Sequence, residues 1–541
     1  MKDGIFQVPE PKNEPILSYL PGSKEREELK KKLDFIKEKF EIPLIIDGIE
    51  VLTGNKGICV PPHDHQLVLA DYNKAGEEEV ETAIEAALNA KENWESFHWS
   101  DRAAILLKAA DLMAGPYRQI MNAATMLGIS KTVFQAEIDV VELIDLFRFN
   151  AYYMSQIYAQ QPSSPRGQWN RLEYRPLEGF VFAITPFNFI SISGNLPTSP
   201  VLMGNTLVWK PASSAVYPAY YIMQVLMEAG LPPGVINFIP GQGSVVGKQI
   251  LNHPDLAGIH FTGSTGVFQW IWKTIGNNIV KYRTYPRIVG ETGGKDFIFV
   301  HESADVNEVA TALIRGAFEF QGQKCSAASR TYIPESMWEG IKEQLVKATS
   351  EFKQGDVEDF TTFMNAVIDQ PTFNNITSYI DYAKNSEEAE ILTGGNFDDS
   401  KGYFIEPTTI VTSNPKFKTI EEEIFGPVLT VYVYPDEKFE ETLELCDNTS
   451  PYALTGSIFA KDRIAIELAS KILRNAAGNF YINDKPTGAV VGQQPFGGTR
   501  ASGTNDKAGS YLNLLRWTSV RTIKENFTPP KDYSYPYMIV E

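Results

Sequence analysis

Cysteine is scarce in this chain, with only Cys59, Cys325 and Cys446 among 541 residues. An odd number of widely spaced thiols does not build a disulfide framework, so we expect free cysteines in a reducing compartment. Basic residues are also in deficit, with 49 Lys and Arg against 67 Asp and Glu and a formal net charge of −18. This balance argues against nucleic acid as a partner, but not against a small nucleotide held by backbone N–H groups.

Long hydrophobic runs are missing as well. One uncharged stretch, Gly179–Trp209, is interrupted by Pro186, Pro197 and Pro200, which is not typical of a membrane-spanning helix. The first residues, Met1–Gly4, show neither an apolar signal core nor an amphipathic leader. We therefore expect no membrane partner and a cytoplasmic location, or the mitochondrial matrix if the chain is eukaryotic and processed.

Histidine is sparse too, with six residues in the whole chain. The segment His63–Asp64–His65 suggests a metal site, yet no third ligand cluster lies near it in sequence. A solvated turn is the better interpretation, and we predict no metal site.

The chain does show a repeated alternation of strand and helix signals. Apolar strand-like runs occur at Gly179–Thr185, Thr206–Trp209, Val235–Ile239 and Gly258–Phe261, and a helical pattern follows each. A second alternating block runs from Ile288 to about Asp484. The rhythm predicts an α/β fold with parallel sheets covered on both faces. Such sheets bind ligands at the carboxyl ends of their strands.

Other segments flank these blocks. Helical patterns are predicted at Ser23–Phe40 and throughout Gly76–Gln160. The polar segment Gln161–Arg175 indicates an excursion from the main body. The tail Phe527–Glu541 is too irregular for a helix and suggests an arm packed on a neighbour.

A nucleotide site is indicated at Gly263–Gly266, which follows an apolar strand and opens a helix. Free N–H groups and the helix dipole favour a pyrophosphate there, and Ser264 adds a hydroxyl. The alternative is an ordinary capped helix. Lys210 ends a strand on the same predicted edge, within reach of ribose hydroxyls. The glycine-rich segment Gly241–Lys248 fits neither the Rossmann nor the Walker spacing.

A reaction centre is indicated by three residues at strand or helix ends. Cys325 lies in the polar segment Phe318–Ser326, where its thiol can meet a ligand, although most cysteines are only small buried hydrophobes. Asn188 can donate to an oxyanion or merely satisfy its turn. Glu291, between apolar residues and a glycine pair, can act as a base with a raised pKa or be simply solvated. No histidine accompanies the cysteine, so its activation requires N–H dipoles, a cofactor or Glu291.

In order and spacing these motifs resemble the aldehyde dehydrogenase superfamily over nearly the whole chain. The resemblance is carried by Phe187–Asn188, Lys210, Phe261–Gly266, Glu291–Gly294, Cys325 and Glu423–Pro427. Within the superfamily the chain is most similar to the enzymes that oxidise L-glutamate γ-semialdehyde. The segments that carry this finer likeness are Gly322–Ala327, Gln135–Asn150, Gln493–Gly498 and Arg500–Asp506.

The resemblance implies NAD-dependent oxidation of L-glutamate γ-semialdehyde, formed from 1-pyrroline-5-carboxylate, to L-glutamate in the second step of proline catabolism. Cys325 would be the nucleophile that forms a thiohemiacetal and then a thioester, Asn188 an oxyanion donor and Glu291 the base. The implied NAD contacts are Thr185, Pro186, Lys210, Gly263, Ser264, Gly266, Thr292, Gly293, Glu423 and Phe425. The implied substrate contacts are Ser326, Gly488 and Ala489 at the carboxylate, and Phe189 and Phe496 beside the aliphatic chain.

Two departures from the family pattern bear on specificity. Ala489 stands where relatives carry Ser, which leaves the implied backbone N–H contact intact. Ser213 stands where relatives strict for NAD carry Glu, so NAD is favoured and some use of NADP stays open. Two rival functions also stay open: an aldehyde dehydrogenase for another ω-semialdehyde acid, and a non-catalytic protein on the same scaffold.

The resemblance also implies an aldehyde dehydrogenase-like architecture. Residues 1–159 and 179–289 would form a Rossmann-type NAD-binding domain with an N-terminal helical part. Residues 290–505 would form an α/β catalytic domain. Residues 160–178 and 515–541 would form a small β oligomerisation flap and a C-terminal arm, so a homodimer or larger homo-oligomer is expected.

Overall fold

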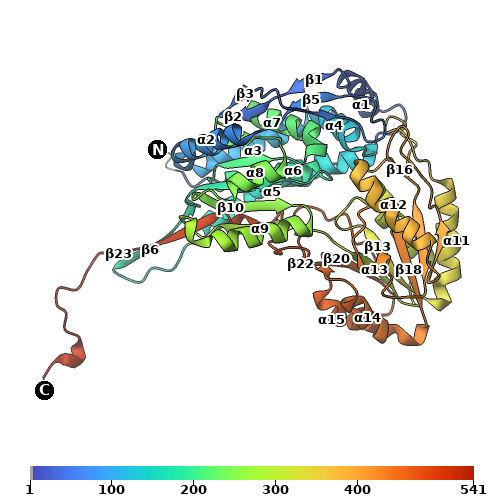
Figure 1. Cartoon of the computed structure of the whole chain (residues 1–541). Helices are drawn as coiled ribbons and strands as arrows, with labels where there is room; N and C mark the ends of the chain where they lie inside the picture. Colours follow the sequence, from blue (N-terminus) through green and yellow to red (C-terminus); the bar gives the residue numbers. More distant parts are fainter. Residues whose placement is uncertain (1–3, 541) are drawn as a thin grey trace.

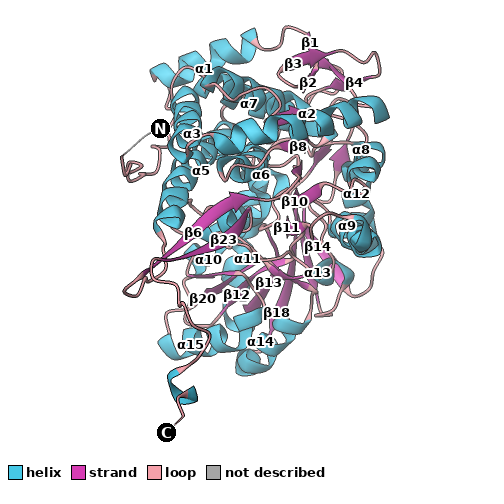
Figure 2. Cartoon of the chain, turned by 90° about the vertical axis from the view of Figure 1, so that its left-hand side faces the viewer, coloured by secondary structure: helices cyan, strands magenta, loops and turns pink. Residues whose placement is uncertain are grey.

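The strand and helix alternation forms two seven-stranded sheets in the computed structural model, which describes residues 4–540 (Figures 1 and 2). Met1–Asp3 and Glu541 lie outside the described residues. The expectations made for the first residues of the chain and for the last residue of the C-terminal arm therefore fall outside them too. The α/β class with mainly parallel sheets is confirmed. Within the described residues, no helix is long and apolar enough to cross a membrane.

The first sheet carries the glycine-rich turns. Its strand order is β11 (Arg287–Glu291), β10 (Leu256–Thr262), β7 (Phe180–Ile184), β8 (Leu207–Lys210), β9 (Ile236–Phe238), β2 (Leu44–Ile46) and β3 (Ile49–Val51). Strands β11 to β9 are parallel, whereas β2 and β3 are antiparallel to their neighbours. The expected boundary between residues 289 and 290 falls inside β11, whose last residues still pair with β10.

Alternating side chains of β7 bury both faces of this sheet. Phe180 and Phe182 pack into the core with helices α2 (Glu77–Ser96), α8 (Gly243–Ile250) and α9 (Thr265–Asn278). Val181 and Ala183 pack on the opposite core, to which α3 (Trp99–Ala114), α4 (Arg118–Ile129), α5 (Val133–Ala159), α6 (Ile190–Leu202) and α7 (Val216–Ala229) contribute. Burial on both faces explains why the strand is apolar at every position.

The second sheet contains the segment after Cys325. Its order is β14 (Ala389–Thr393), β17 (Thr408–Thr412), β18 (Val428–Tyr434), β13 (Ala328–Pro334), β12 (Asp296–Val300), β20 (Thr455–Phe459) and β21 (Asn479–Ile482). All pairs are parallel except β14 with β17. One core involves α10 (Val306–Phe318) and α11 (Glu335–Glu351), and the other involves α14 (Phe439–Asn448) and α15 (Arg463–Ile472). Helix α12 (Gln370–Lys384) packs near β14.

One of the two-stranded sheets leaves the main body. Strand β6 (Gln168–Pro176) pairs antiparallel with β23 (Thr518–Asn526), and Figure 1 shows this ribbon extending outward with the C-terminal tail beyond it. Up to Val540, the last described residue, the tail contains one short 3₁₀ turn at Pro536–Met538 and no other helix or strand, as its irregular sequence predicts.

The N-terminal part differs from prediction in two details. Helix α1 covers only Lys24–Phe35, because Phe40 starts strand β1 (Phe40–Ile42), which pairs with β5 (Ala70–Asn73) beside β4 (Lys56–Cys59). The turn His63–His65 is solvated only in part. His63 is buried with its Nδ1 2.7 Å from Ser130 Oγ, and burial lowers its pKa to about 4, whereas Asp64 and His65 are partly exposed. Among the described residues no group of three or more His, Cys, Asp or Glu is placed to hold a metal ion.

Candidate active site

A cavity of about 660 Å³ opens at the carboxyl ends of the first sheet's strands and reaches Cys325. Both sheets contribute to it, because the ends of β7, β8 and β10 face a loop that precedes β13 and another that precedes β18. The sequence-predicted residues that line it are Thr185, Pro186, Asn188, Lys210, Gly263, Ser264, Thr292, Gly293, Cys325, Glu423 and Phe425.

The chain before Cys325 adopts an unusual backbone. Phe320 and Gln321 have φ angles of 53° and 56°, the left-handed region that non-glycine residues seldom occupy. The buried Gln321 side chain fixes this conformation. Its Nε2 donates to the carbonyls of Ser130 and Ala366 at 3.0 and 2.8 Å, and its Oε1 accepts from Asn365 N at 3.0 Å.

Two glycines allow the backbone to crowd around the thiol loop. Gly322 has φ +65°, and a Cβ there would lie 2.2 Å from the Gly426 carbonyl oxygen. A Cβ on Gly294 would lie 2.1 Å from the Cys325 carbonyl oxygen. Only glycine fits such close approaches. The loop is therefore locked on both sides, and Cys325 stays partly exposed at the cavity.

The Cys325 thiol is not activated in the protein alone. Burial raises its pKa well above the usual value, and the nearby carboxyl groups of Asp296, Glu291 and Glu423 raise it further. The thiolate fraction at neutral pH is then very small. A cofactor's positive charge or proton transfer to a base is needed for nucleophilic attack.

Asn188 lies in the turn four residues after the end of β7 and is buried. Its Nδ2 donates to the carbonyl oxygen of Gln323 at 3.1 Å, which fixes the amide beside the thiol loop. The second amide N–H has no partner among the described residues. It is available to an oxygen in the cavity that Asn188 and Cys325 both line.

Glu291 is the last residue of β11 and does not line the cavity. Burial raises the pKa of its carboxyl group well above the usual value, although its Oε2 accepts from Gly498 N at 3.2 Å. The residue is half-buried and its carboxyl group holds this one backbone hydrogen bond. The motif Arg500–Asp506 supports this strand, because Thr504 N donates to Gly290 O at 2.9 Å and Gly290 N donates to Thr504 Oγ1 at 3.0 Å.

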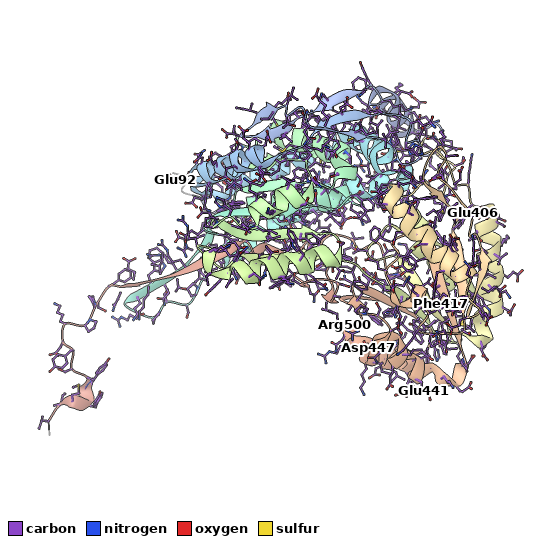
Figure 3. All side chains as sticks on the ribbon, viewed as in Figure 1. Glu92, Glu406, Phe417, Glu441, Asp447 and Arg500 are labelled. Carbon is purple, nitrogen blue, oxygen red and sulfur yellow. The ribbon has the colours of Figure 1, made fainter. Side chains whose placement is uncertain are left out.

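Arg500, the first residue of the same motif, makes a structural contact. Arg500, at φ 51°, donates to the Asp447 carboxylate and carbonyl, both at 2.7 Å. Figure 3 shows these two side chains close together at the edge of the second sheet's domain. They lie away from the cavity lining, so Arg500 positions the segment that supports β11.

Several predicted cofactor residues have defined partners. Ser264 caps α9 by accepting from Val267 N at 3.4 Å. Lys210 is buried, its Nζ donates to Pro211 O at 3.0 Å, and burial lowers its pKa to about 8. Gly266 lies on α9 and does not line the cavity. Thr292 N donates to Ser502 O at 2.9 Å.

Two glycines fix the position of the Glu423 carboxylate. Its Oε1 accepts from Gly294 N at 2.9 Å, and a Cβ on Gly293 would lie 2.1 Å from its Oε2. Burial raises the pKa of Glu423 to about 7. Two residues further on, Phe425 has φ 59° and packs edge-on against Phe187 at 5.8 Å between ring centroids.

The predicted substrate residues are outside this cavity. Ser326, Gly488, Ala489, Phe189 and Phe496 are all absent from its lining. Ser326 directly follows Cys325. Gly488 has φ +99° in a loop held by Lys485, whose Nζ donates to Thr487 O at 3.0 Å, and Phe189 packs edge-on against Phe320.

Sequence reasoning missed a buried ionic pair behind Phe189. Lys131 Nζ lies 2.7 Å from Asp139 Oδ2 and 3.8 Å from the centre of the Phe189 ring. Asp139 also accepts from Ile190 N and Ser191 N, both at 2.9 Å, and so fixes the start of α6 directly after Asn188 and Phe189. The available signal was the presence of acidic residues at buried positions of the apolar helix α5.

Comparison with known proteins agrees with this geometry. The family model "Aldehyde dehydrogenase family" matches residues 53–523. A Dictyostelium discoideum protein named "Delta-1-pyrroline-5-carboxylate dehydrogenase, mitochondrial" is 55% identical over 537 residues, covering 98% of this chain and 96% of its own. The Homo sapiens protein of the same name is 49% identical, with 97% and 94% covered.

Solved structures agree as well. The Delta-pyrroline-5-carboxylate dehydrogenase of Mycobacterium tuberculosis bound with NAD has a TM-score of 0.97 at 51% identity and full coverage of both chains. The 1-pyrroline-5-carboxylate dehydrogenase from Thermus with bound NAD has a TM-score of 0.91 at 35% identity, covering 96% and 100%. On the fold, the cavity and these matches, the chain belongs to the aldehyde dehydrogenase family.

Proposed function

We propose that the chain is an NAD-dependent L-glutamate γ-semialdehyde dehydrogenase, also called 1-pyrroline-5-carboxylate dehydrogenase. The observation that supports this most directly is the cavity shared by Cys325, Asn188 and the cofactor residues. Relatives at about half identity over almost the entire chain carry this name. The product is L-glutamate, and the reaction is the second step of proline catabolism.

In the proposed mechanism the Cys325 thiol first loses its proton to water, which the positive charge of a bound cofactor would favour, and the thiolate sulfur attacks the aldehyde carbon. A C–S bond forms, and the carbonyl electron pair moves to oxygen. The second N–H of Asn188 and the backbone N–H of Cys325 hold that oxyanion. A bound NAD would supply the acceptor for the hydride of that carbon, which would leave Cys325 carrying a thioester. Glu291 removes a proton from water as it attacks the thioester, and the acid is released with the thiol restored.

The residues of the cavity suit a dinucleotide. In the turn Gly263–Ser264, the Gly263 N–H already donates to Glu291 O at 3.2 Å, and Ser264 at the start of α9 offers its hydroxyl to the pyrophosphate. Lys210 offers an ammonium for the adenosine ribose, and Glu423 a carboxylate for the other ribose. Gly293 approaches Glu423 so closely that a Cβ would lie 2.1 Å from its Oε2, so no larger residue can replace this glycine without moving the carboxylate. Thr185, Pro186, Thr292 and Phe425 complete the proposed contacts, with Gly266 permitting close approach on α9.

The proposed substrate group recognises a carboxylate without a cation. Ser326 offers a hydroxyl, and the loop at Gly488–Ala489 offers backbone N–H groups in the left-handed turn of Gly488. Phe189 and Phe496 would enclose the aliphatic chain. This arrangement selects a short aldehyde with a terminal carboxylate.

The domain assignment and assembly belong to the same proposal. Residues 1–159 and 179–289 would bind NAD, and residues 290–505 would hold the nucleophile. The ribbon of β6 and β23, with the arm beyond it, would join a second copy of the chain in a homodimer or larger assembly. The location would be the cytoplasm, or the mitochondrial matrix, which the names of several relatives indicate.

A substrate panel tests the proposal. Purified protein is assayed for NADH production with L-glutamate γ-semialdehyde and with ω-semialdehyde acids one carbon shorter and longer, each with NAD and NADP. We expect the highest kcat/KM for glutamate semialdehyde with NAD, and no turnover by Cys325→Ala, which should still bind NAD. A higher kcat/KM for another homologue would assign a different ω-semialdehyde. Absence of NADH with every aldehyde would indicate a non-catalytic protein.

A further inference from the structure

The loop 485–494 carries the proposed carboxylate contacts at Gly488–Ala489 and leads into Phe496. It contains no helix or strand, so no regular backbone ladder fixes its shape. Within the loop, Val490 N donates to the side-chain oxygen of Gln494 at 2.9 Å, which closes a turn but does not join the loop to the rest of the protein. Contacts from outside the loop must therefore hold it in place.

Asn13 makes such a contact from the N-terminal segment, 478 residues before its partner Val491. Its Nδ2 donates to Val491 O at 2.9 Å and to Asp145 Oδ2 at 2.8 Å. Its Oδ1 accepts from Gln493 Nε2 at 3.2 Å. Both N–H groups and the carbonyl of the amide are in use, so the side chain is fixed in one orientation. Asn13 thus fixes the loop close behind Gly488.

The other partner of Asn13, Asp145, lies on α5 and is 2% exposed. Its Oδ1 accepts from Glu14 N at 2.8 Å, so two consecutive residues of the N-terminal segment bind one buried carboxylate. Helix α5 also contacts the loop directly, because a Cβ on Gly492, at φ +81°, would lie 2.1 Å from Phe149 Cε1. The loop is therefore fixed to α5 at two adjacent residues, once directly and once through the N-terminal segment.

The same helix fixes the other wall of the proposed substrate site. Asp139, also on α5, accepts from Ile190 N and Ser191 N, both at 2.9 Å, and so sets the position of the preceding Phe189. One helix thus sets the position of Phe189 on one side and of the loop with Gly488–Ala489 on the other. The separation of the two sides determines which carboxylate-bearing aldehyde can reach the nucleophile with both of its ends in contact.

We propose that Asn13 is a positioning residue that determines selectivity for an aldehyde with a carboxylate at its far end. This inference rests on the proposed function. Asn13 does not touch the substrate. It holds Val491 so that the N–H groups of Gly488–Ala489 stay at a set distance from Cys325. Without this side chain the loop keeps its internal turn but loses its connection to α5 through the N-terminal segment, which weakens the carboxylate contact and leaves the chemistry at the thiol unchanged.

The test compares Asn13→Ala with the wild type in the full-length protein. The substrates are L-glutamate γ-semialdehyde, 5-oxopentanoate, which lacks the ammonium, and butanal, which also lacks the carboxylate. We expect KM for the first two, and the inhibition constant of the product L-glutamate, to rise about fivefold or more, as the loss of one hydrogen bond implies. The kcat for the semialdehyde and kcat/KM for butanal should stay within about twofold of the wild type.

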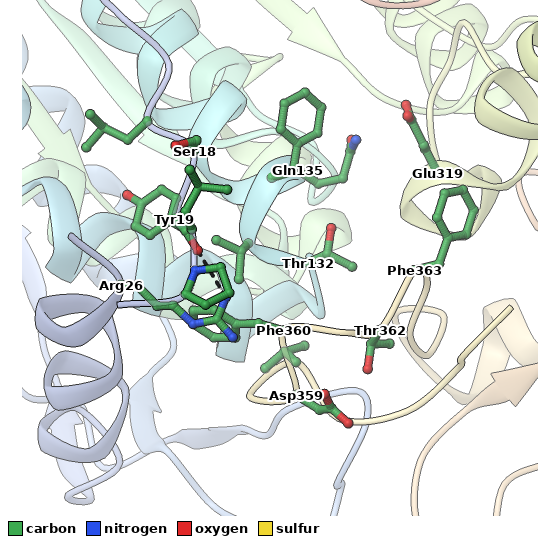
Figure 4. Close-up of a pocket in the computed structure, with 16 residues that line it drawn as sticks. Ser18, Tyr19, Arg26, Thr132, Gln135, Glu319, Asp359, Phe360, Thr362 and Phe363 are labelled. Carbon is green, nitrogen blue, oxygen red and sulfur yellow. Dashed lines mark hydrogen bonds between the residues drawn. The ribbon is translucent and has the colours of Figure 1, made fainter. Parts of the chain in front are cut away.

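Tyr19→Phe is the matched control, because it removes another hydrogen bond of the same segment. Tyr19 OH donates to Glu137 Oε2 at 2.8 Å, and Figure 4 shows this part of the segment with the bond from Arg26 to Tyr19 O. It lines a separate cavity of about 330 Å³ with the start of α5. We expect a lowered melting temperature in this variant, with KM and the inhibition constant unchanged. Equal rises in Tyr19→Phe and Asn13→Ala would assign the effect to stability and overturn the proposal.

A second variant approaches the contact from the loop side. Gln493→Ala removes the hydrogen bond to Asn13 Oδ1 and leaves Asp145 paired, so it should raise the same KM by about twofold even if Asn13→Ala is unstable. Unchanged KM in both variants, or an equal rise for butanal, refutes the role of Asn13. A wild type that does not oxidise the semialdehyde would instead refute the proposed function.

Discussion

Burial shifts the pKa values of individual residues in and beside the cofactor cavity. The Cys325 thiol, the Glu291 carboxyl and the Glu423 carboxyl all have raised pKa values with burial as the main cause, and Lys210 has a lowered pKa for the same reason. Each shift favours the neutral form of its group. With pKa values of about 8 for Lys210 and about 7 for Glu423, both groups can change their protonation state near neutral pH when a charged ligand binds.

Glu291→Gln should separate the two halves of the proposed reaction. An amide cannot take the proton of water, so the thioester on Cys325 should accumulate. We expect a burst of NADH of about one per site followed by a steady rate at least ~100-fold below wild type, in line with the loss of a general base. Stopped-flow absorbance at 340 nm measures both phases, with an unchanged steady rate as the contradicting result.

The raised pKa of Glu423 predicts a dependence of stability on pH. The folded protein keeps this carboxyl protonated up to about pH 7, whereas the unfolded chain ionises near its ordinary value of 4.5. The free energy of unfolding is therefore unaffected by this group below pH 4.5. It falls as the pH rises toward 7, by roughly 3 kcal/mol for this one carboxyl. Urea unfolding of the cofactor-free protein between pH 4.5 and 8 should show a decline that Glu423→Gln reduces. Identical dependences of stability on pH in the wild type and in Glu423→Gln would show that Glu423 does not cause the decline.

At the scale of elements, the sequence predicted strands more securely than loops. Continuous apolar runs gave β7, β8, β9 and β10 to within one or two residues, because burial on both faces leaves no polar positions. The end of α1 was missed because the residues after Phe35 are helix-compatible, while pairing of Phe40 with β5 is a long-range contact.

The candidate site was only partly accessible to local reasoning. Ser264 and Lys210 follow from strand ends, but the burial of Glu291 depends on Gly498 and Thr504, about two hundred residues later. The left-handed backbone at Phe320 and Gln321 leaves no signal in residue types, since neither is glycine. The roles of Gly488 and Phe496 came from family resemblance and stay predictions.

The thiol loop offers a test at this scale. In Gly322→Ala the new Cβ would meet the Gly426 carbonyl at a left-handed position, so we expect a loss of ~2 kcal/mol or more in stability and a large loss of turnover. The control Gly276→Ala adds a Cβ to α9 where nothing lies within 4 Å, and should be neutral or stabilising by up to ~1 kcal/mol. Thermal melts and kcat measure the two effects. Equal changes of melting temperature and kcat in Gly322→Ala and Gly276→Ala would contradict a clash at Gly322.

At the scale of the whole molecule, the ribbon of β6 and β23 and the tail beyond it contribute little to either core. The tail residues Tyr533, Tyr537, Ile539 and Val540 are at least 78% exposed. Large apolar side chains on an extended arm suit contact with another chain.

Truncation after Asn526 should therefore weaken self-association and leave the fold intact. We expect the full chain to sediment as a dimer or larger species, and the truncated chain to dissociate at concentrations at least tenfold higher. Analytical ultracentrifugation over a dilution series measures this, with circular dichroism as the control for folding. An unchanged dissociation profile would remove the arm from the interface.

The short connection Thr292–Lys295 joins the last residue of β11 to the first residue of β12. An edge strand of one sheet thus passes directly into an interior strand of the other, and both ends of the connection are pinned, by Ser502 and by Glu423. A chimera that exchanges one half of the molecule should therefore not be joined at Thr292–Lys295, because the new junction would lose the contacts with Ser502 and Glu423. The graft would have to carry the connection, Glu423 and the Arg500–Asp506 motif together.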